Sequence, residues 1–218
     1  MKETNHSSVN IKLRPLALCA LAALFCSCAA TSVKKTWKSP DCQQPVGKIA
    51  VLAVDDRGLL RQGFENRFVR YLANAGASAV VTFDLLSLPQ IKEDKRAAAD
   101  RFRASGAEAL LILRLVDVGS SYRESRAGTE RYAPMITGVD SMGWYDYYSV
   151  GFMDMSSTYG NLTQTVSLET SLYDLKTEKR LWSGLTRTVV KENMDRVAEM
   201  DPLVGMIIAA MRKDGVIR

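Results

Sequence analysis

The side chains best suited to acid–base catalysis and metal binding are concentrated at the N-terminal end of this 218-residue chain. His6 is the only histidine, and Cys19, Cys26 and Cys28 are three of the four cysteines, with Cys42 alone further along. Zinc sites are usually built from cysteine and histidine ligands, and Ser-His-Asp or Cys-His catalysis requires an imidazole. The chemistry open to the protein therefore depends on whether its first residues remain attached.

The first 28 residues have the three-part pattern of a secretory signal. Lys2, Lys12 and Arg14 form a basic end, the apolar run Leu16–Phe25 follows, and small residues come next. A membrane-spanning helix needs about 20 apolar residues, and this run is half that length. A buried core helix is the alternative, but it would leave the basic flank and the small-residue exit as coincidences. We therefore predict that residues 1–27 are a signal peptide.

The exit of this segment, Leu24–Ala30, resembles the lipobox of bacterial lipoproteins, in which apolar and small residues precede a cysteine that becomes lipidated. Cys28 fits that position, with Ser27 before it, although Phe25 stands where leucine is usual. The resemblance implies cleavage before Cys28, with a diacylglycerol thioether and an N-acyl chain such as palmitate added to it. Two or more acyl chains anchor a protein stably. The non-acidic Ala29 implies attachment to the outer membrane, facing the periplasm.

Removal of residues 1–27 would leave 191 of the 218 residues, without histidine and with Cys42 as the only free thiol. This composition excludes an intradomain disulfide, a Cys/His zinc site and imidazole-based catalysis, while Ser-Lys and carboxylate pairs remain open. Loss of three basic residues and one acidic residue lowers the formal charge from +5 to +3, too small a bias for nucleic-acid binding. We expect no metal and no cofactor beyond the covalent lipid on Cys28.

Residues 28–46 are polar, contain two prolines and lack periodicity, which predicts a flexible tether. Within this tether, Cys42 either crosslinks two copies of the protein or faces solvent. A single α/β domain is predicted for residues 47–218.

Apolar runs in this domain predict strands at 49–54, 79–83 and 109–118, with helices at 60–75 and 93–104 between them. Alternation in Thr165–Asp174 predicts a strand with one wet face, paired antiparallel with 181–190. Asp201 is expected to be the N-cap of a final helix. The predicted fold class is α/β with a mixed sheet: β-α-β-α-β, then an antiparallel strand pair and a C-terminal helix, in a layered sandwich.

An aromatic-rich insert at about 119–161 interrupts this order. Its second half holds Trp144, Tyr145, Tyr147, Tyr148, Phe152 and Tyr159. Long loops without secondary structure are usually functional or disordered, and this one is too apolar for plain disorder. The aromatic residues are therefore a candidate interaction surface, since tyrosine and tryptophan give large contact areas at low entropic cost. The alternative is that the rings pack on the protein's own sheet.

Acidic residues suggest two enzyme hypotheses, a receiver domain and a carboxylate-dependent hydrolase. The stretch ending in Asp55-Asp56 is similar to the first strand of response-regulator receivers, where an acidic pair binds magnesium beside a phosphorylated aspartate, a place that Asp117 would take. The proline turn expected after Asp117 and a later Lys-Pro pair are missing, so we expect Asp55 and Asp56 to cap the following helix instead.

The element order behind a lipobox resembles envelope lipoproteins with a domain like the N-terminal domain of TolB, a design shared by the curli secretion lipoprotein and the lipoprotein activators of penicillin-binding proteins. The stretches Leu168–Gly184 and Lys213–Ile217 also look like a broad group of uncharacterised small lipoproteins. This resemblance supplies no catalytic residues and implies a scaffold or assembly role.

We therefore expect a non-catalytic, lipid-anchored envelope protein that binds an envelope protein partner or a second copy of itself, and no nucleic acid. The alternative is a periplasmic hydrolase or glycan-binding protein that uses carboxylates. Asp140, Asp146 and Asp154 are its candidates, although their spacing is not diagnostic.

Overall fold

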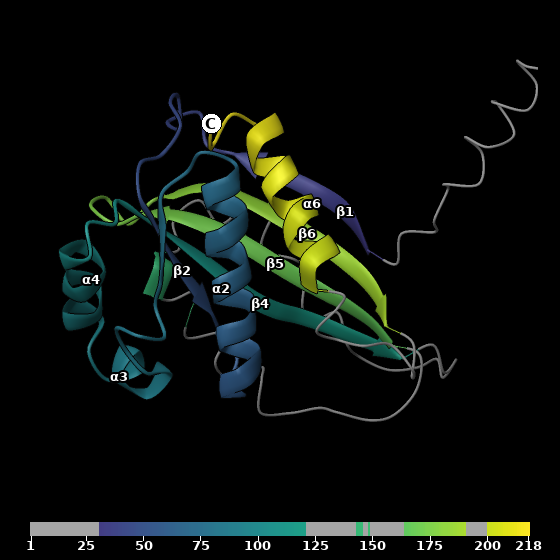
Figure 1. The fold of residues 1–218 in the computed structure, drawn as a ribbon, viewed down its shortest axis with the longest axis horizontal. Coiled ribbons are helices and arrows are strands. Elements are labelled where there is room, and N and C mark those ends of the chain that lie inside the picture. The colour runs from purple at the N-terminus through teal and green to yellow at the C-terminus, as the bar shows by residue number, and fades with distance from the viewer. Residues whose placement is uncertain (1–30, 121–142, 146–147, 149–163, 191–199) are drawn as a thin grey trace, which may run out of the picture.

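Six strands form one mixed sheet with helices on both faces (Figure 1). The computed structural model describes residues 31–120, 143–145, 148, 164–190 and 200–218. The elements are, in order, β1 (Thr31–Lys38), β2 (Ile49–Ala53), α2 (Gly58–Asn74), β3 (Ala79–Val81), α3 (Leu88–Glu93), α4 (Lys95–Ala104), β4 (Ala109–Ser120), β5 (Gln164–Asp174), β6 (Arg180–Val190) and α6 (Met200–Lys213). The predicted fold class is confirmed.

The strands lie in the order β1-β6-β5-β4-β2-β3 across the sheet. β2 is parallel to β3 and β4, whereas β4–β5, β5–β6 and β1–β6 are antiparallel pairs. The parallel part therefore comes from the two predicted crossover units, and the antiparallel part comes from the predicted strand pair together with β1. Strand β2 lies between the two strands that follow it in the chain, so the carboxyl end of β2 is the point where the strand order reverses.

Helices α2 and α6 pack side by side on one face of the sheet (Figure 1). Alternate residues of a strand point to the same face, so every second apolar residue of β2 and β4 contacts these helices. The core on this face includes Ile49, Val51, Leu111, Leu172 and Trp182 from the sheet, Phe68 and Leu72 from α2, and Val204 and Ile207 from α6.

Helices α3 and α4 cover the opposite face, over β2 and β4. The sequence predicts a turn at 87–89 and one helix at 93–104, but the structure contains two helices here. Ser87 begins α3 through a capping box with Gln90, and proline occupies its first turn. Asp94 then has extended backbone angles and accepts hydrogen bonds from the N–H groups of Arg96 and Ala97, so it starts α4 as a new helix.

The predicted flexible tether is wrong from residue 31 onward. Residues Thr31–Lys38 form the edge strand β1, which pairs with β6 and bulges between Val33 and Lys35. The Arg180 guanidinium lies 4.9 Å from the centre of the Trp37 ring. Residues 31–38 show little of the alternation that is typical of strands. This segment is a strand because it pairs with the otherwise open edge of β6.

Cys42 also differs from the expectation of a solvent-facing thiol, because it is buried in the core beneath α6. The segment around it is held down where the Val46 N–H donates to the Val216 carbonyl at 3.0 Å. Burial raises the pKa of the Cys42 thiol, and the charge of Lys38 opposes that rise. In the folded domain this thiol is therefore neither accessible nor activated for crosslinking. None of the helices in the described ranges has the length and apolar character needed to cross a bilayer.

Candidate functional site

Two of the six aromatic residues expected to form an interaction surface are instead part of the core. Trp144 and Tyr148 are fully buried against α3 and α4. Trp144 meets the edge of Phe102 at 6.1 Å between ring centres, and the Tyr148 hydroxyl donates to the Leu88 carbonyl at 2.6 Å. For these two residues, the alternative of packing within the fold holds.

The reason lies in the small side chains of α4. This helix buries Ala98 and Ala99 beside Phe102, which leaves room over the sheet that larger rings fill. Tyr145 is partly buried, and its hydroxyl donates to the Lys92 carbonyl at 2.6 Å. The anchor residue Cys28 and the aromatic residues Tyr147, Phe152 and Tyr159 lie outside the described residues, so their roles stay predictions.

A buried ion pair occupies the carboxyl end of β2, where the strand order reverses and α/β proteins commonly bind ligands. The Arg61 Nε donates to Glu65 Oε1 at 2.8 Å. Glu65 also accepts from the N–H groups of Ala53, Thr82 and Phe83, at 3.2, 2.7 and 2.8 Å. These contacts tie α2 to the ends of β2 and β3. This network of hydrogen bonds fills the carboxyl end of β2, where a ligand would otherwise bind.

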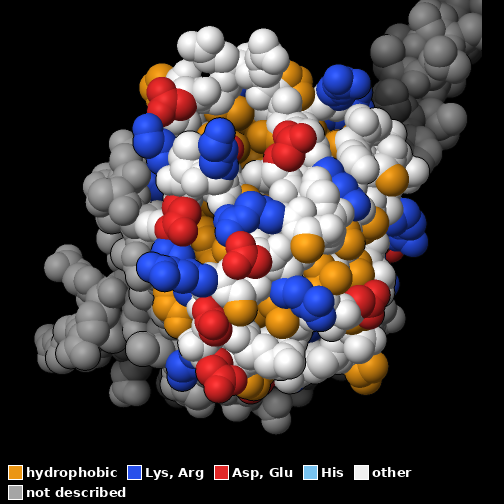
Figure 2. All heavy atoms as spheres, turned by 90° about the vertical axis from the view of Figure 1, so that its left-hand side faces the viewer, with side chains coloured by type: hydrophobic (Ala, Val, Ile, Leu, Met, Phe, Trp, Pro, Cys, Tyr) orange, Lys and Arg blue, Asp and Glu red, His pale blue; other side chains and the backbone are white. Residues whose placement is uncertain are grey.

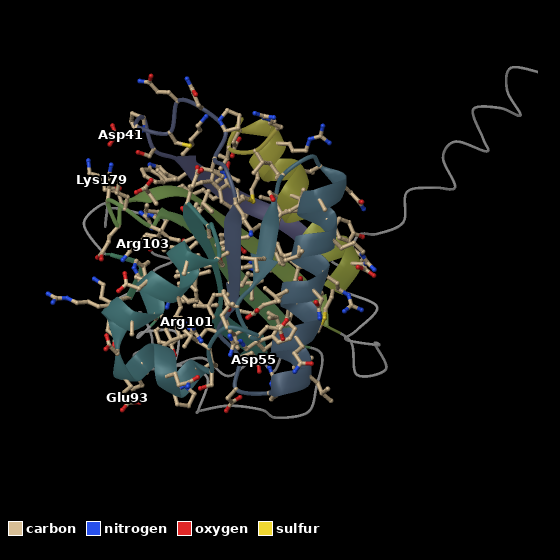
Figure 3. All side chains as sticks on the ribbon, turned by 60° about the vertical axis from the view of Figure 1, so that its left-hand side comes forward. Asp41, Asp55, Glu93, Arg101, Arg103 and Lys179 are labelled. Atoms are coloured by element: carbon tan, nitrogen blue, oxygen red, sulfur yellow. The ribbon has the colours of Figure 1, made fainter. Side chains whose placement is uncertain are left out.

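The acidic pair at the same end is also engaged within the protein. Asp55, seen beside the start of α2 in Figure 3, accepts from the N–H of Arg57 at 2.9 Å and from its guanidinium Nε at 2.8 Å. Arg57 is itself the N-cap residue of α2 and its side chain makes no capping hydrogen bond, so neither Asp55 nor Asp56 is the expected N-cap. Within the ranges that the structure describes, no group of three or more histidine, cysteine or acidic side chains is placed to hold a metal ion.

Tyr148 lies close enough to Arg61 to feel its charge. Burial raises the pKa of Tyr148 from 10.0 to about 12, the arginine charge opposes this rise, and Tyr145 adds to it. The phenol therefore stays protonated at neutral pH. It acts as a hydrogen-bond donor to α3 rather than as a base.

The sheet face opposite α6 carries a buried polar cluster that the sequence reasoning missed. Arg114 Nη2 donates to Glu169 Oε2 at 3.0 Å across the β4–β5 pair, and both side chains are buried. Ser171 and Ser183, which face each other across β5 and β6, are buried beside them. Strand β5 was expected to have a wet face here. The signal for burial was Arg114 itself, a single charge within an apolar run.

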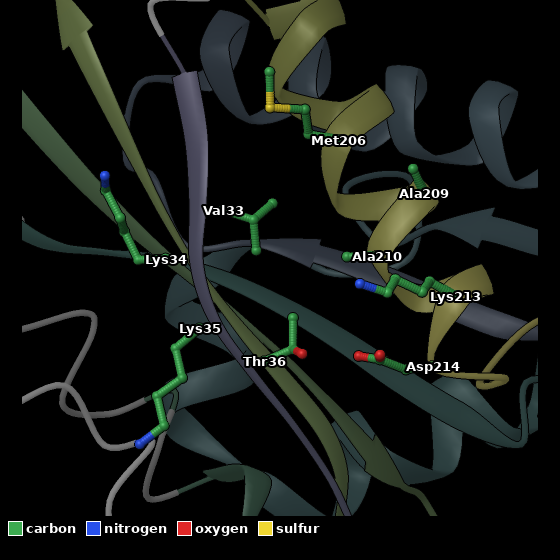
Figure 4. A pocket seen from close by; sticks show the side chains of 9 residues that line it. All are labelled: Val33, Lys34, Lys35, Thr36, Met206, Ala209, Ala210, Lys213 and Asp214. Carbon is green, nitrogen blue, oxygen red and sulfur yellow. The ribbon is translucent and has the colours of Figure 1, made fainter.

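An open groove of about 440 Å³ lies between β1 and α6 on the other face (Figure 4). Val33 and Thr36 point into it from β1, and Met206, Ala209 and Ala210 face them from α6. Lys34 and Lys35 also border it, but both side chains point away from the helix. The groove therefore has small apolar walls. It offers contact area rather than catalytic groups.

The polar end of this groove is internally tied. The Trp182 indole N–H donates to Asp214 Oδ2 at 2.8 Å, and Lys38 Nζ donates to the Gly215 carbonyl at 3.3 Å. Asp214 is thus held in place by a core residue of β6. Lys213 is the exposed charged side chain on the α6 rim.

Comparison with known proteins finds solved structures that are only distantly similar to this chain. No protein-family model matches the chain, and no curated protein sequence matches it. The PelC dodecamer from Paraburkholderia phytofirmans is similar over 86% of this chain and 99% of its own, with 13% identity and a TM-score of 0.43. A second structure of that dodecamer gives 14% identity over 82% of this chain and 96% of its own, with a TM-score of 0.45. Lipoprotein GNA1162 from Neisseria meningitidis is similar over 77% of this chain and 96% of its own, with 16% identity and a TM-score of 0.36. Likeness at this level carries neither an activity nor an assembly state to this chain.

Proposed function

We propose that the protein is a lipid-anchored, non-catalytic interaction module of the bacterial cell envelope, attached through Cys28 to the outer membrane and facing the periplasm. The observation that carries this proposal is the N-terminal sequence, in which a signal-like segment ends in the lipobox-like Leu24–Ala30. The proposal includes no metal and no cofactor other than the covalent lipid.

The internal ties of the domain support a non-catalytic role. Two carboxylates are buried within the described residues, Glu65 and Glu169, and each is bound to an arginine. Engagement of both carboxylates by buried guanidinium groups favours a structural role for them over a role as general acid or nucleophile. Asp140, Asp146 and Asp154, the candidates for a carboxylate-dependent hydrolase, lie outside the described residues.

The groove between β1 and α6 is the surface that we propose for contact with another protein, either an envelope partner or a second copy. Its walls combine small and adaptable apolar side chains, Val33, Met206, Ala209 and Ala210, with polar groups at one end. Such concave apolar surfaces accommodate an inserted side chain or segment with little rearrangement.

Anchoring is tested by intact mass measurement on protein extracted from the membranes of a Gram-negative host. The wild type is expected to have the mass of a chain that starts at Cys28 plus its acyl groups, and Cys28→Ala is expected to lack this species. A membrane-extracted protein that retains Met1 would contradict the proposal.

Contact through the groove is tested with Ala209→Arg, which places a long charged side chain on an exposed groove position. Arginine is nearly as good a helix former as alanine, so the fold is expected to tolerate it. Ala97→Arg, at an exposed position of α4, is the matched control. We expect crosslinked species and oligomer mass, read by crosslinking in cells and light scattering in detergent, to fall for Ala209→Arg alone. Equal behaviour of the two variants would remove the groove from the proposal.

A further inference from the structure

The structure places the start of the folded domain almost at the predicted lipid attachment point. β1 begins at Thr31, so only Ala29 and Ala30 separate it from Cys28. Three residues of extended chain span about 10 Å at most. A domain lipidated at Cys28 is therefore held with the first residues of β1 at the membrane surface. This inference rests on the lipidation in the proposed function.

The surface beside this end of β1 is basic. Lys34 and Lys35 lie at the β1 bulge and are exposed, and both point away from the β1–α6 groove (Figure 4). On β6, Arg187 is exposed opposite Ser32, and Val189 is 39% exposed two residues further on. Lys34, Lys35, Arg187 and Val189 are together called the anchor-side patch.

The three cations of the anchor-side patch make no ion pair with any described residue. The strand segments that carry them, 31–36 and 185–190, contain no acidic residue. Neighbouring strands lie about 5 Å apart, so Arg187 is close to the first residues of β1 and hence to the anchor. The patch thus combines positive charge, a partly exposed apolar side chain and proximity to the bilayer.

The opposite end of the molecule has a different surface. Lys179 and Asp41 form an ion pair at 3.3 Å there (Figure 3), and Lys95 pairs with Glu178 at 2.5 Å. Figure 2, which views the molecule from that side, shows basic and acidic side chains interspersed rather than segregated. The unpaired charges of the anchor-side patch are therefore a local feature, not a consequence of the overall basic composition.

We propose that the anchor-side patch docks on anionic phospholipid headgroups and so fixes the orientation of the anchored domain. Basic side chains near an anionic bilayer surface attract it within about a Debye length, on the order of 8 Å at physiological ionic strength. The short link from Cys28 already holds the patch within that range, so docking does not have to order a long chain segment. The domain then lies with β1 and β6 at the membrane and with the β5–β6 turn facing away.

The test uses the lipidated protein reconstituted in phosphatidylcholine vesicles with about one third phosphatidylglycerol. An environment-sensitive fluorophore is attached to Val189→Cys, or to Lys176→Cys at the far end, in a Cys42→Ala background. A headgroup nitroxide lipid is the quencher. We expect strong quenching at residue 189 and weak quenching at residue 176.

The second arm reverses the charges with Lys34→Glu, Lys35→Glu and Arg187→Glu together. For this variant, the ratio of docked to undocked domain is expected to fall by on the order of tenfold or more. A similar fall is expected for the wild type in vesicles of pure phosphatidylcholine. The matched control, with the same change in net charge and also read at residue 189, is Arg96→Glu, Arg101→Glu and Lys176→Glu, three exposed positions, and it should leave the quenching unchanged.

Equal quenching at the two label positions, or quenching at residue 189 that survives charge reversal at the patch, would overturn the docking proposal. Unfolding curves of the charge variants in urea check that the fold is intact. The intact mass of each preparation reports the lipid on Cys28 separately. An anchored domain that stands off the membrane contradicts docking alone, whereas a protein without lipid contradicts the proposed function and the docking with it.

Discussion

The Trp182 indole on β6 and the Asp214 carboxylate just after α6 form a hydrogen bond of 2.8 Å that joins two stretches far apart in the sequence. Trp182 is fully buried between the sheet and α6, whereas Asp214 is partly exposed. The bond ties the end of the C-terminal helix to the sheet.

A double-mutant cycle measures this tie. Trp182→Phe, Asp214→Ala and the double variant are expected to show a coupling of about 1 kcal/mol in the free energy of unfolding, because the bond joins an indole donor to a partly solvated carboxylate. Urea denaturation followed by circular dichroism gives the three values. Fully additive effects would show that the two groups do not stabilise each other.

Gly184→Ala should be strongly destabilising although it adds only one methyl group. A Cβ at this position would lie 2.5 Å from Cη2 of the Trp182 ring, which is enclosed and cannot move aside. Overpacking of this kind costs about 1–3 kcal/mol. Gly58→Ala in the first turn of α2 is the control, because no atom lies within 4 Å of the position that its Cβ would take. It should leave stability unchanged or raise it by up to about 1 kcal/mol.

Removing one partner of the buried pair at the end of β2 should cost more than removing both. Glu65→Ala leaves the Arg61 charge unpaired and removes the acceptor of Arg61 Nε and of the N–H groups of Thr82 and Phe83, and a loss of about 3–5 kcal/mol is expected. Arg61→Met with Glu65→Leu removes both charges and replaces them with apolar bulk. Thermal and urea unfolding should rank the double variant above Glu65→Ala, and the reverse order would contradict the prediction.

Stability should fall at alkaline pH through Tyr148. Its pKa is raised by burial from 10.0 to about 12, so the folded state keeps its proton where the unfolded state loses it. The contribution is fully present below pH 10 and is lost as pH rises from 10 to 12. Tyr148→Phe should flatten this part of the stability–pH curve, at the cost of the bond to the Leu88 carbonyl, worth about 1 kcal/mol. Urea midpoints measured across this range test it, and an unchanged slope in the variant would count against it.

Local patterns in the sequence predicted much of the fold. The apolar run at 109–118 and the alternating run at 165–174 are β4 and β5 to within two residues, since continuous and alternating hydrophobicity report a strand's own burial. The end of α2 is also marked in the sequence, because Gly76 follows the C-cap Ala75 and takes the left-handed conformation, with φ of 77°, in which glycine commonly ends a helix.

The features that the sequence did not predict depend on contacts with residues distant in the chain. β1 exists because β6 offers an open edge, and nothing in residues 31–38 identifies that partner. Glu169 lies on a face that alternation makes wet, yet it is buried because Arg114 neutralises it from the neighbouring strand. Trp144 is buried because it packs against Phe102 of α4 in the core cluster on this face of the sheet. Each of these outcomes is set by a tertiary partner, which sequence periodicity does not encode.

The pairing of β1 with β6 also affects the order in which the protein folds. The hydroxyl groups of Thr31 and Thr188 lie 2.9 Å apart across this pair, although 157 positions separate them in the chain. β1 can therefore pair with β6 only after almost the entire polypeptide has been synthesised. Closure of such a long loop is slow compared with local folding. The edge formed by β1 is thus the last part of the sheet to be completed.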